Sequence, residues 1–273
     1  MGSDGARPGG AAPRARRSAR FAHVALTLGL AATASAQDAP RILDLVGRAR
    51  SGDVAARAEL AGVFRDAAPP LDRARLHALG EAAIELAATG DGAVEILERA
   101  RELLEGAGLP ESEVNVARQL GHEWMRRGEP DKAIAEWRRG SRLPARALRP
   151  WLLVELAAAL RGRGEWAGAE EAIADAEKAL VPGDAFHHMA RAAVFGERGQ
   201  QELDLGVANL AFRSFLEERR VADEIGEPVL RLAARLHEIH YALAVEDGAE
   251  ATRLASEALA DPALVASAPG TAA

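Results

Sequence analysis

Residues 120–144 read LGHEWMRRGEPDKAIAEWRRGSRLP, and residues 156–182 repeat their order of small and large apolar residues as LAAALRGRGEWAGAEEAIADAEKALVP. Gly121 of the first stretch corresponds to Ala157 of the second, 36 residues later. Each stretch holds two apolar helical stripes separated by a glycine. A period of this length predicts helical hairpins that stack on one another.

Small residues in these stretches mark the points where helices are expected to approach closely. Gly121 and Ala157 lie where the two helices of a hairpin should cross, because a small side chain lets two backbones come together. Gly128 is expected to end a helix in the left-handed conformation, and Pro130 to occupy the first turn of the next helix. The two stretches therefore predict an all-α fold built from helix pairs.

The first stretch resembles a tetratricopeptide repeat (TPR). The residues that carry the resemblance are Leu120 and Gly121, the aromatic Trp124, Ala133 at the start of the second helix, Trp137 four residues later and the closing Pro144. The match is good over residues 114–147, fair over residues 150–183 and weaker elsewhere. The resemblance implies a right-handed solenoid of stacked hairpins, whose first helices line a concave groove that binds a peptide or a partner helix.

The rest of the chain is expected to follow the same plan. Asp53 is a predicted N-cap, a further helix is expected to begin after Asp72, and Asp247-Gly248 is a predicted turn. Residues 37–260 then form one helical repeat domain of about six hairpins, with roughly 37 residues in each. Residues 261–273 are rich in proline, alanine, serine and glycine, which predicts a disordered tail.

The first 36 residues differ from the remainder and predict a signal peptide. Four arginines precede an apolar run over residues 21–34, and Ala34-Ser35-Ala36 has the small-x-small form of a cleavage site. The run is shorter than the roughly 20 residues of a membrane helix, which disfavours a retained anchor. Ala19 and Arg20 disfavour a twin-arginine signal. We expect cleavage after Ala36 and export to the periplasm or the medium, with no stable membrane span afterwards.

Composition excludes several classes of function. The chain has 273 residues and no cysteine, which excludes disulfide frameworks, thiolate metal sites and cysteine nucleophiles. Its net charge is −7, and residues 1–36 carry five arginines and one aspartate, so the remainder carries −11. Such an acidic surface disfavours nucleic acid and anionic lipid as partners. Of the 34 basic residues only Lys132 and Lys178 are lysine, which suggests a GC-rich bacterial genome.

No catalytic motif stands out. The sequence has no Gly-x-Ser-x-Gly elbow, no phosphate-binding loop with a lysine and no dinucleotide fingerprint. His237 and His240 are three residues apart, so they would need a third ligand from elsewhere to hold a metal ion. Paired carboxylates such as Glu170-Glu171 are typical of solvated helix faces. We therefore expect no enzyme activity, no cofactor and no bound metal.

The groove implied by the resemblance supplies the candidate binding residues. The packing positions of residues 114–147 leave one face of the first helix toward the groove, and the next hairpin contributes a second set. These residues are Asn115, Arg118, His122, Met125, Arg126, Trp151 and Arg161. Val154 and Ala158 occupy positions where a carboxylate clamp would need polar side chains. An apolar segment is therefore the expected ligand, with Trp151 either as its anchor or buried at the seam between repeats.

Three functions follow from these observations. The first is a non-enzymatic scaffold of the bacterial cell envelope that binds a protein or peptide through its concave groove. The second is a structural subunit of an envelope complex that contacts its partners by its caps or convex face. The third is a metal-binding protein or an enzyme that uses the histidines. The sequence does not identify the partner.

Overall fold

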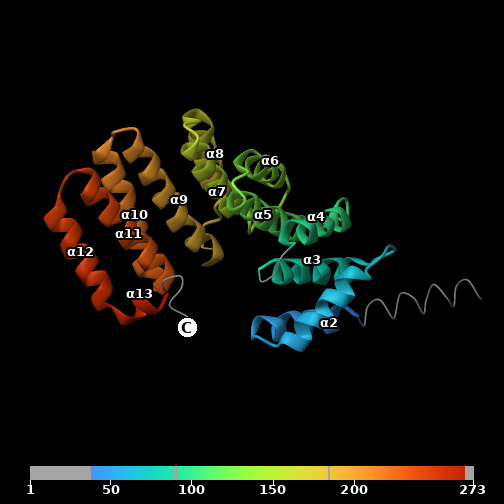
Figure 1. Ribbon diagram of the computed structural model, residues 1–273. Coiled ribbons are helices and arrows are strands. Elements are labelled where there is room, and N and C mark those ends of the chain that lie inside the picture. Colours follow the sequence, from blue (N-terminus) through green and yellow to red (C-terminus); the bar gives the residue numbers. More distant parts are fainter. Residues whose placement is uncertain (1–37, 89–91, 184, 268–273) are drawn as a thin grey trace, which may run out of the picture. The chain divides into compact units, whose positions relative to one another are not determined.

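The computed structural model describes residues 38–88, 92–183 and 185–267, and every regular element in these ranges is a helix (Figure 1). A helix over residues 38–50 is followed by α2 (Val54–Arg65), α3 (Arg73–Ala87), α4 (Ala93–Leu104), α5 (Pro110–Arg126), α6 (Pro130–Ser141), α7 (Arg149–Gly162), α8 (Trp166–Ala179), α9 (Ala185–Asp204), α10 (Ala208–Ile225), α11 (Pro228–Ala244), α12 (Gly248–Ala260) and α13 (Pro262–Ser267). The all-α prediction is confirmed. The predicted signal peptide, residues 1–36, lies outside the described residues.

The chain divides into two compact units, Met1–Leu86 and Ala87–Ala273. In the first unit, Asp53 caps α2 by accepting a hydrogen bond from the Ala56 amide at 2.9 Å, as predicted. The helix over residues 38–50 is tied to α3 by Arg50, which pairs with Glu81 at 3.1 Å and with Glu85 at 3.3 Å.

In the second unit, helices pack as adjacent pairs: α5 with α6, α7 with α8, α9 with α10, and α11 with α12. The first helix of a hairpin also contacts both helices of the preceding hairpin. Thus α7 contacts α5 and α6, α9 contacts α7 and α8, and α11 contacts α9 and α10. Helix α7 is therefore surrounded by neighbours, which explains why its sequence is apolar around most of its circumference.

The expected helix crossing at Gly121 is present. A Cβ atom built on Gly121 would lie 2.1 Å from Nε1 of Trp137, so α5 and α6 approach more closely there than any side chain on Gly121 allows. Trp137 is buried, and its Nε1 donates a hydrogen bond to the Arg118 carbonyl oxygen at 3.2 Å. The turn at Gly128 is also as predicted, with a left-handed φ of 72°, and Gly164 at the corresponding place in the next hairpin has a φ of 74°.

Residues 262–267, expected to belong to a disordered tail, instead form the short helix α13. The Asp261 side chain accepts a hydrogen bond from the Ala263 amide at 2.9 Å, and Pro262 suits the first turn of a helix. Leu264 is buried, and α13 contacts both α11 and α12. The rest of the predicted tail, residues 268–273, lies outside the described residues.

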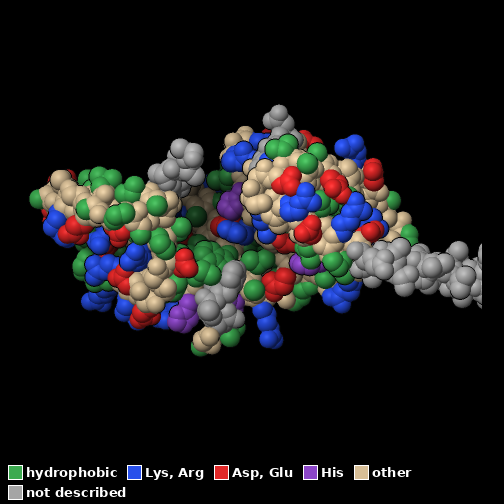
Figure 2. All heavy atoms as spheres, turned by 90° about the horizontal axis from the view of Figure 1, so that it is seen from below, with side chains coloured by type: hydrophobic (Ala, Val, Ile, Leu, Met, Phe, Trp, Pro, Cys, Tyr) green, Lys and Arg blue, Asp and Glu red, His purple; other side chains and the backbone are tan. Residues whose placement is uncertain are grey.

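The surface is mixed in character. Basic and acidic side chains alternate with hydrophobic patches over the face drawn in Figure 2. Within the described part of the chain, we find no helix whose length and apolar character would suit a bilayer crossing.

Candidate functional site

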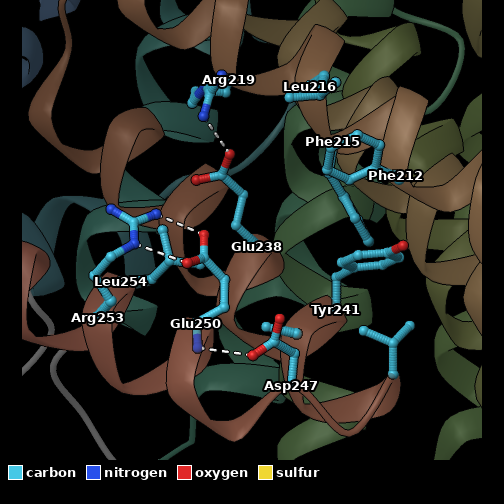
Figure 3. A pocket seen from close by; sticks show the side chains of 12 residues that line it. Phe212, Phe215, Leu216, Arg219, Glu238, Tyr241, Asp247, Glu250, Arg253 and Leu254 are labelled. Carbon is cyan, nitrogen blue, oxygen red and sulfur yellow. Dashed lines mark hydrogen bonds and ion pairs between the residues drawn. The ribbon is translucent and has the colours of Figure 1, made fainter.

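A hollow of about 260 Å³ opens between α10, α11 and α12, and we call it the C-terminal pocket (Figure 3). Its lining consists of Phe212, Phe215, Leu216, Arg219, Glu238, Tyr241, Ala242, Val245, Asp247, Glu250, Arg253 and Leu254. Helix α11 contacts both α10 and α12. The C-terminal pocket therefore lies between α10 and α12, each the second helix of its hairpin, and α11 forms part of its wall.

Aromatic rings form one wall of the C-terminal pocket. The Phe212 and Tyr241 rings are tilted by 36° with centroids 5.4 Å apart, and Phe215 meets Tyr241 edge-on at 6.3 Å. Phe215 is buried, whereas Phe212 is 46% exposed. The wall thus combines a buried ring, Phe215, with a ring that solvent or a ligand can reach, Phe212. An exposed aromatic ring beside a fixed hollow is typical of a surface that binds an apolar group.

The charged residues around the C-terminal pocket are paired with one another. Arg219 donates to Glu238 at 2.8 Å, and Arg253 donates from Nε to Glu250 at 2.7 Å. Asp247 accepts a hydrogen bond from the Glu250 amide at 3.0 Å. The two arginines offset Glu238 and Glu250, and Asp247 is bonded to the α12 backbone, so the wall of the pocket is left to apolar side chains. An aliphatic or aromatic side chain fits this chemistry better than a charged ligand.

The predicted groove residues occupy α5 and α7, and the structure brings three of them together. Arg118 donates from Nε to Glu155 at 2.6 Å, and its guanidinium carbon lies 6.0 Å from the centre of the Trp151 ring. His122 Nε2 is 3.1 Å from the same Glu155 oxygen. Trp151 is half-buried. Arg118, His122 and Trp151 therefore form one cluster across α5 and α7, held by Glu155.

The other predicted residues lie outside this cluster. Asn115 is half-buried on α5, and Met125 and Arg126 are exposed at the end of the same helix. Arg126 pairs with Glu123. Arg161 points to the next hairpin, where it donates to Glu197 and to Asp204, each at 2.7 Å. Arg161 therefore joins α7 to α9, and its role in binding a ligand stays a prediction.

Two buried carboxylates take part in contacts between neighbouring helices in this part of the chain. Glu197 and Glu218 are both buried, and burial raises the pKa of each carboxyl above its usual value. Arg161 opposes this rise in the pKa of Glu197, and His237 opposes it in the pKa of Glu218. His237 Nδ1 lies 2.7 Å from Glu218. The polar groups therefore join α7 to α9 and α10 to α11.

The two candidate metal-binding histidines have protein partners. His237 meets Glu218 of α10, and His240 Nδ1 lies 3.0 Å from the amide oxygen of Gln200 on α9. Within residues 38–88, 92–183 and 185–267, His, Asp and Glu side chains form no group of three or more that would suit a metal ion. Both histidines thus link α11 to the preceding hairpin.

The C-terminal pocket was not predicted from the sequence. Phe212 and Phe215 lie three residues apart on α10, a spacing that by itself indicates only an apolar helix face. Tyr241, the only tyrosine of the chain, lies on another helix. These three aromatic residues could have indicated the pocket, but whether they lie close together depends on how α11 crosses α10. Compared with known proteins, the chain matches no family model and no curated protein.

Proposed function

We propose that this chain is a non-enzymatic scaffold that binds a protein or peptide, and that its hairpins form a right-handed, TPR-like solenoid. The close contact between Gly121 and Trp137 and the repeated contacts of each first helix with the preceding hairpin support this arrangement. The observation that carries the binding function is the C-terminal pocket, with its aromatic wall and its rim of paired charges. The partner would insert an apolar side chain there.

The size of the C-terminal pocket fits one or two side chains of a peptide. Its volume is about 260 Å³, which is at or just below the lower end of the range for small-molecule sites. Burial of a large apolar side chain contributes roughly 1.5–3 kcal/mol, so one anchor needs further contacts to give useful affinity. Phe212 and Val245, which line the pocket and are both exposed, supply apolar surface at its edge.

A selection from a random peptide library tests this proposal. Peptides enriched on the wild type are expected to share a large aliphatic or aromatic residue. The double variant Phe212→Ala and Tyr241→Ala should weaken their binding by about tenfold or more, measured by isothermal titration calorimetry. Leu210→Ala is the matched control, because Leu210 is exposed on the same helix but does not line the pocket.

The α5–α7 cluster is the second candidate surface for the same function. A variant with Arg118→Glu and Trp151→Ala removes the predicted groove contacts while leaving the C-terminal pocket unchanged. If the selected peptides lose affinity for this variant and bind the pocket variant as tightly as the wild type, the groove is the binding surface and the pocket assignment is wrong.

We also propose that the chain is exported to the periplasm or the medium. The arginines and apolar run of residues 1–36 and the Ala34-Ser35-Ala36 site support this. Intact mass measurement of the exported protein is expected to give a chain that begins at Gln37. A variant with Ala34→Leu and Ala36→Leu should accumulate uncleaved. A mature wild-type protein that keeps residues 1–36 would contradict the proposal.

A further inference from the structure

Two buried carboxylates and one histidine meet where α9, α10 and α11 pack together. Glu197 of α9 is 8% exposed, and Glu218 of α10 is 3% exposed. Glu197 has a permanent cation beside it, because Arg161 of α7 donates to it at 2.7 Å. Within the described part of the chain, the only ion pair of Glu218 is with His237 of α11, whose Nδ1 lies 2.7 Å away. We call these two residues the Glu218–His237 pair.

Electrical neutrality in this region requires one proton on the Glu218–His237 pair. The two glutamates carry two negative charges when both are ionised, and Arg161 balances one of them. His237 balances the other only while its imidazole is protonated. When the pair releases its proton to solvent, one buried carboxylate keeps its charge without a cation, which is costly in a protein interior.

The pKa of Glu218 gives the direction of the pH dependence. Burial raises this pKa, His237 opposes the rise, and Glu238 adds to it. A carboxyl with a raised folded-state pKa contributes its full stabilisation below its unfolded value of about 4.3. That stabilisation is lost as the pH rises through the raised pKa. The contact between α10 and α11 should therefore be strongest in mild acid.

The other charged and titratable groups around the Glu218–His237 pair have partners of their own. Glu238 of α11 accepts hydrogen bonds from Arg219 of α10 and from Arg235, each at 2.8 Å. The remaining groups are Asp204 of α9 bonded to Arg161, His240 of α11 beside Gln200, Glu217 of α10 paired with Arg220, and Glu257 of α12 at 3.9 Å from Arg235. His237 is therefore the residue that balances the charge of Glu218.

The backbone of α9 lies directly against the Glu218–His237 pair. A Cβ atom built on Gly196 would lie 2.6 Å from Oε1 of Glu218 and 2.9 Å from Cε1 of His237. Glu218 is thus enclosed by three helices, whereas 31% of the His237 side chain is exposed and can exchange its proton with water. A charged Glu218 becomes hydrated only if α11 moves away from α9 and α10.

The Glu218–His237 pair also contacts the aromatic wall of the C-terminal pocket. The His237 ring stacks on Phe215, with ring centroids 5.5 Å apart and 27° between the ring planes. Phe215 precedes Glu218 by three residues on α10, and Tyr241 follows His237 by one turn on α11. Both rings line the pocket. A movement of α11 that hydrates Glu218 therefore separates the rings that form the wall.

We propose that the Glu218–His237 pair is a pH-sensitive switch that controls the C-terminal pocket. With a proton on the pair, α11 stays packed on α9 and α10, and the pocket binds an apolar side chain. Loss of this proton loosens α11 and weakens binding, so the partner is held more tightly at pH 5.5 than at pH 8. The inference rests on the proposed function of the pocket, but the loosening of α11 can be measured without a ligand.

Hydrogen exchange of the backbone amides of α11 and α12, followed by mass spectrometry, tests the switch in the free protein. After correction for the intrinsic effect of pH on exchange, protection of these amides should fall about tenfold or more from pH 5.5 to pH 8, the factor that corresponds to one pKa unit. Protection of α11 that is equal at the two pH values would overturn the proposal.

Two variants assign the pH dependence to Glu218. Glu218→Gln keeps the size of the side chain and its hydrogen bond to His237 but carries no charge, so protection of α11 should change by about twofold or less. Glu217→Gln is the matched control, because the Glu217 side chain is 45% exposed and pairs with Arg220. It should behave like the wild type. A full pH dependence in Glu218→Gln would contradict the role of the pair.

Calorimetry with an uncharged peptide tests the effect on binding. A peptide selected at pH 5.5, blocked at both ends and without ionisable residues, should bind the wild type about tenfold more weakly at pH 8. It should bind Glu218→Gln equally at both pH values. Equal affinity of the wild type at both pH values would overturn the regulation and leave the proposed function intact. If no selected peptide depends on Phe212 and Tyr241 at either pH, the proposed function is wrong and the regulation falls with it.

Discussion

Replacing Gly121 with leucine is expected to destabilise the second unit by about 3 kcal/mol or more. A Cβ at this position would lie 2.1 Å from Nε1 and 2.3 Å from Cε2 of Trp137, so α5 and α6 must separate. Trp137 would then also lose its hydrogen bond to the Arg118 carbonyl oxygen. Leucine favours a helix by about 0.8 kcal/mol relative to glycine, which is too little to offset these losses.

Urea denaturation followed by far-UV circular dichroism measures this effect. Gly162→Ala is the matched control, because Gly162 also lies in a helix but a Cβ there meets no atom within 4 Å. It should leave stability unchanged or raise it by up to about 1 kcal/mol. Equal midpoints for Gly121→Leu and the wild type would refute the close helix crossing.

Replacing Arg161 with methionine is expected to cost about 2–3 kcal/mol at neutral pH. The change leaves Glu197 buried without its cationic partner, and breaking a buried ion pair typically costs 3–5 kcal/mol. We expect somewhat less because 21% of the Arg161 side chain is exposed. Glu197→Gln should cost about 1 kcal/mol or less, since Arg161 keeps its bond to Asp204 at 2.7 Å.

The cost of Arg161→Met should also depend on pH. Burial already raises the pKa of Glu197, and loss of Arg161 would raise this pKa further. A carboxyl with a raised folded-state pKa holds its proton better in the folded protein, so stability falls as pH rises from about 4.3 through the raised pKa. The penalty should therefore be larger at pH 7 than at pH 5.

Denaturation of four proteins at both pH values checks this prediction: the wild type, the two single variants and the double variant. In the Glu197→Gln background, Arg161→Met should cost less and show no pH dependence, because no buried carboxylate remains there. An equal penalty for Arg161→Met at both pH values would mean that Glu197 is not the group left unpaired.

Features that depend on residues near one another in the chain were predicted well. Asp53 and Gly128 act through the geometry of one turn, and the close crossing at Gly121 joins two helices separated by one hairpin turn. In these cases a short stretch of sequence contains all the residues that determine the feature. The sequence did not identify Trp137 as the residue opposite Gly121. The short helix α13 was missed, although Asp261 and Pro262 are ordinary helix-start signals, because six residues show no apolar period.

The candidate sites were predicted less well, because they depend on how separate helices cross. The bonds from Arg161 to Glu197 and Asp204 on α9 could not be predicted, because these partners are 36 and 43 residues away in sequence. Periodicity identifies an apolar face but not whether that face is covered. Leu236 and Leu243 of α11 are apolar but 54% and 58% exposed, and the C-terminal pocket depends on the placement of α10, α11 and α12 together.

The neighbour-to-neighbour packing of the second unit has a consequence for how the chain acquires its structure. Within residues 92–267, each helix contacts only helices one or two positions away in sequence. The contacts of low sequence separation that result favour rapid folding, and each hairpin can begin to fold before the next one is available. A chain synthesised from its N-terminus onward can thus fold one hairpin at a time as it leaves the ribosome.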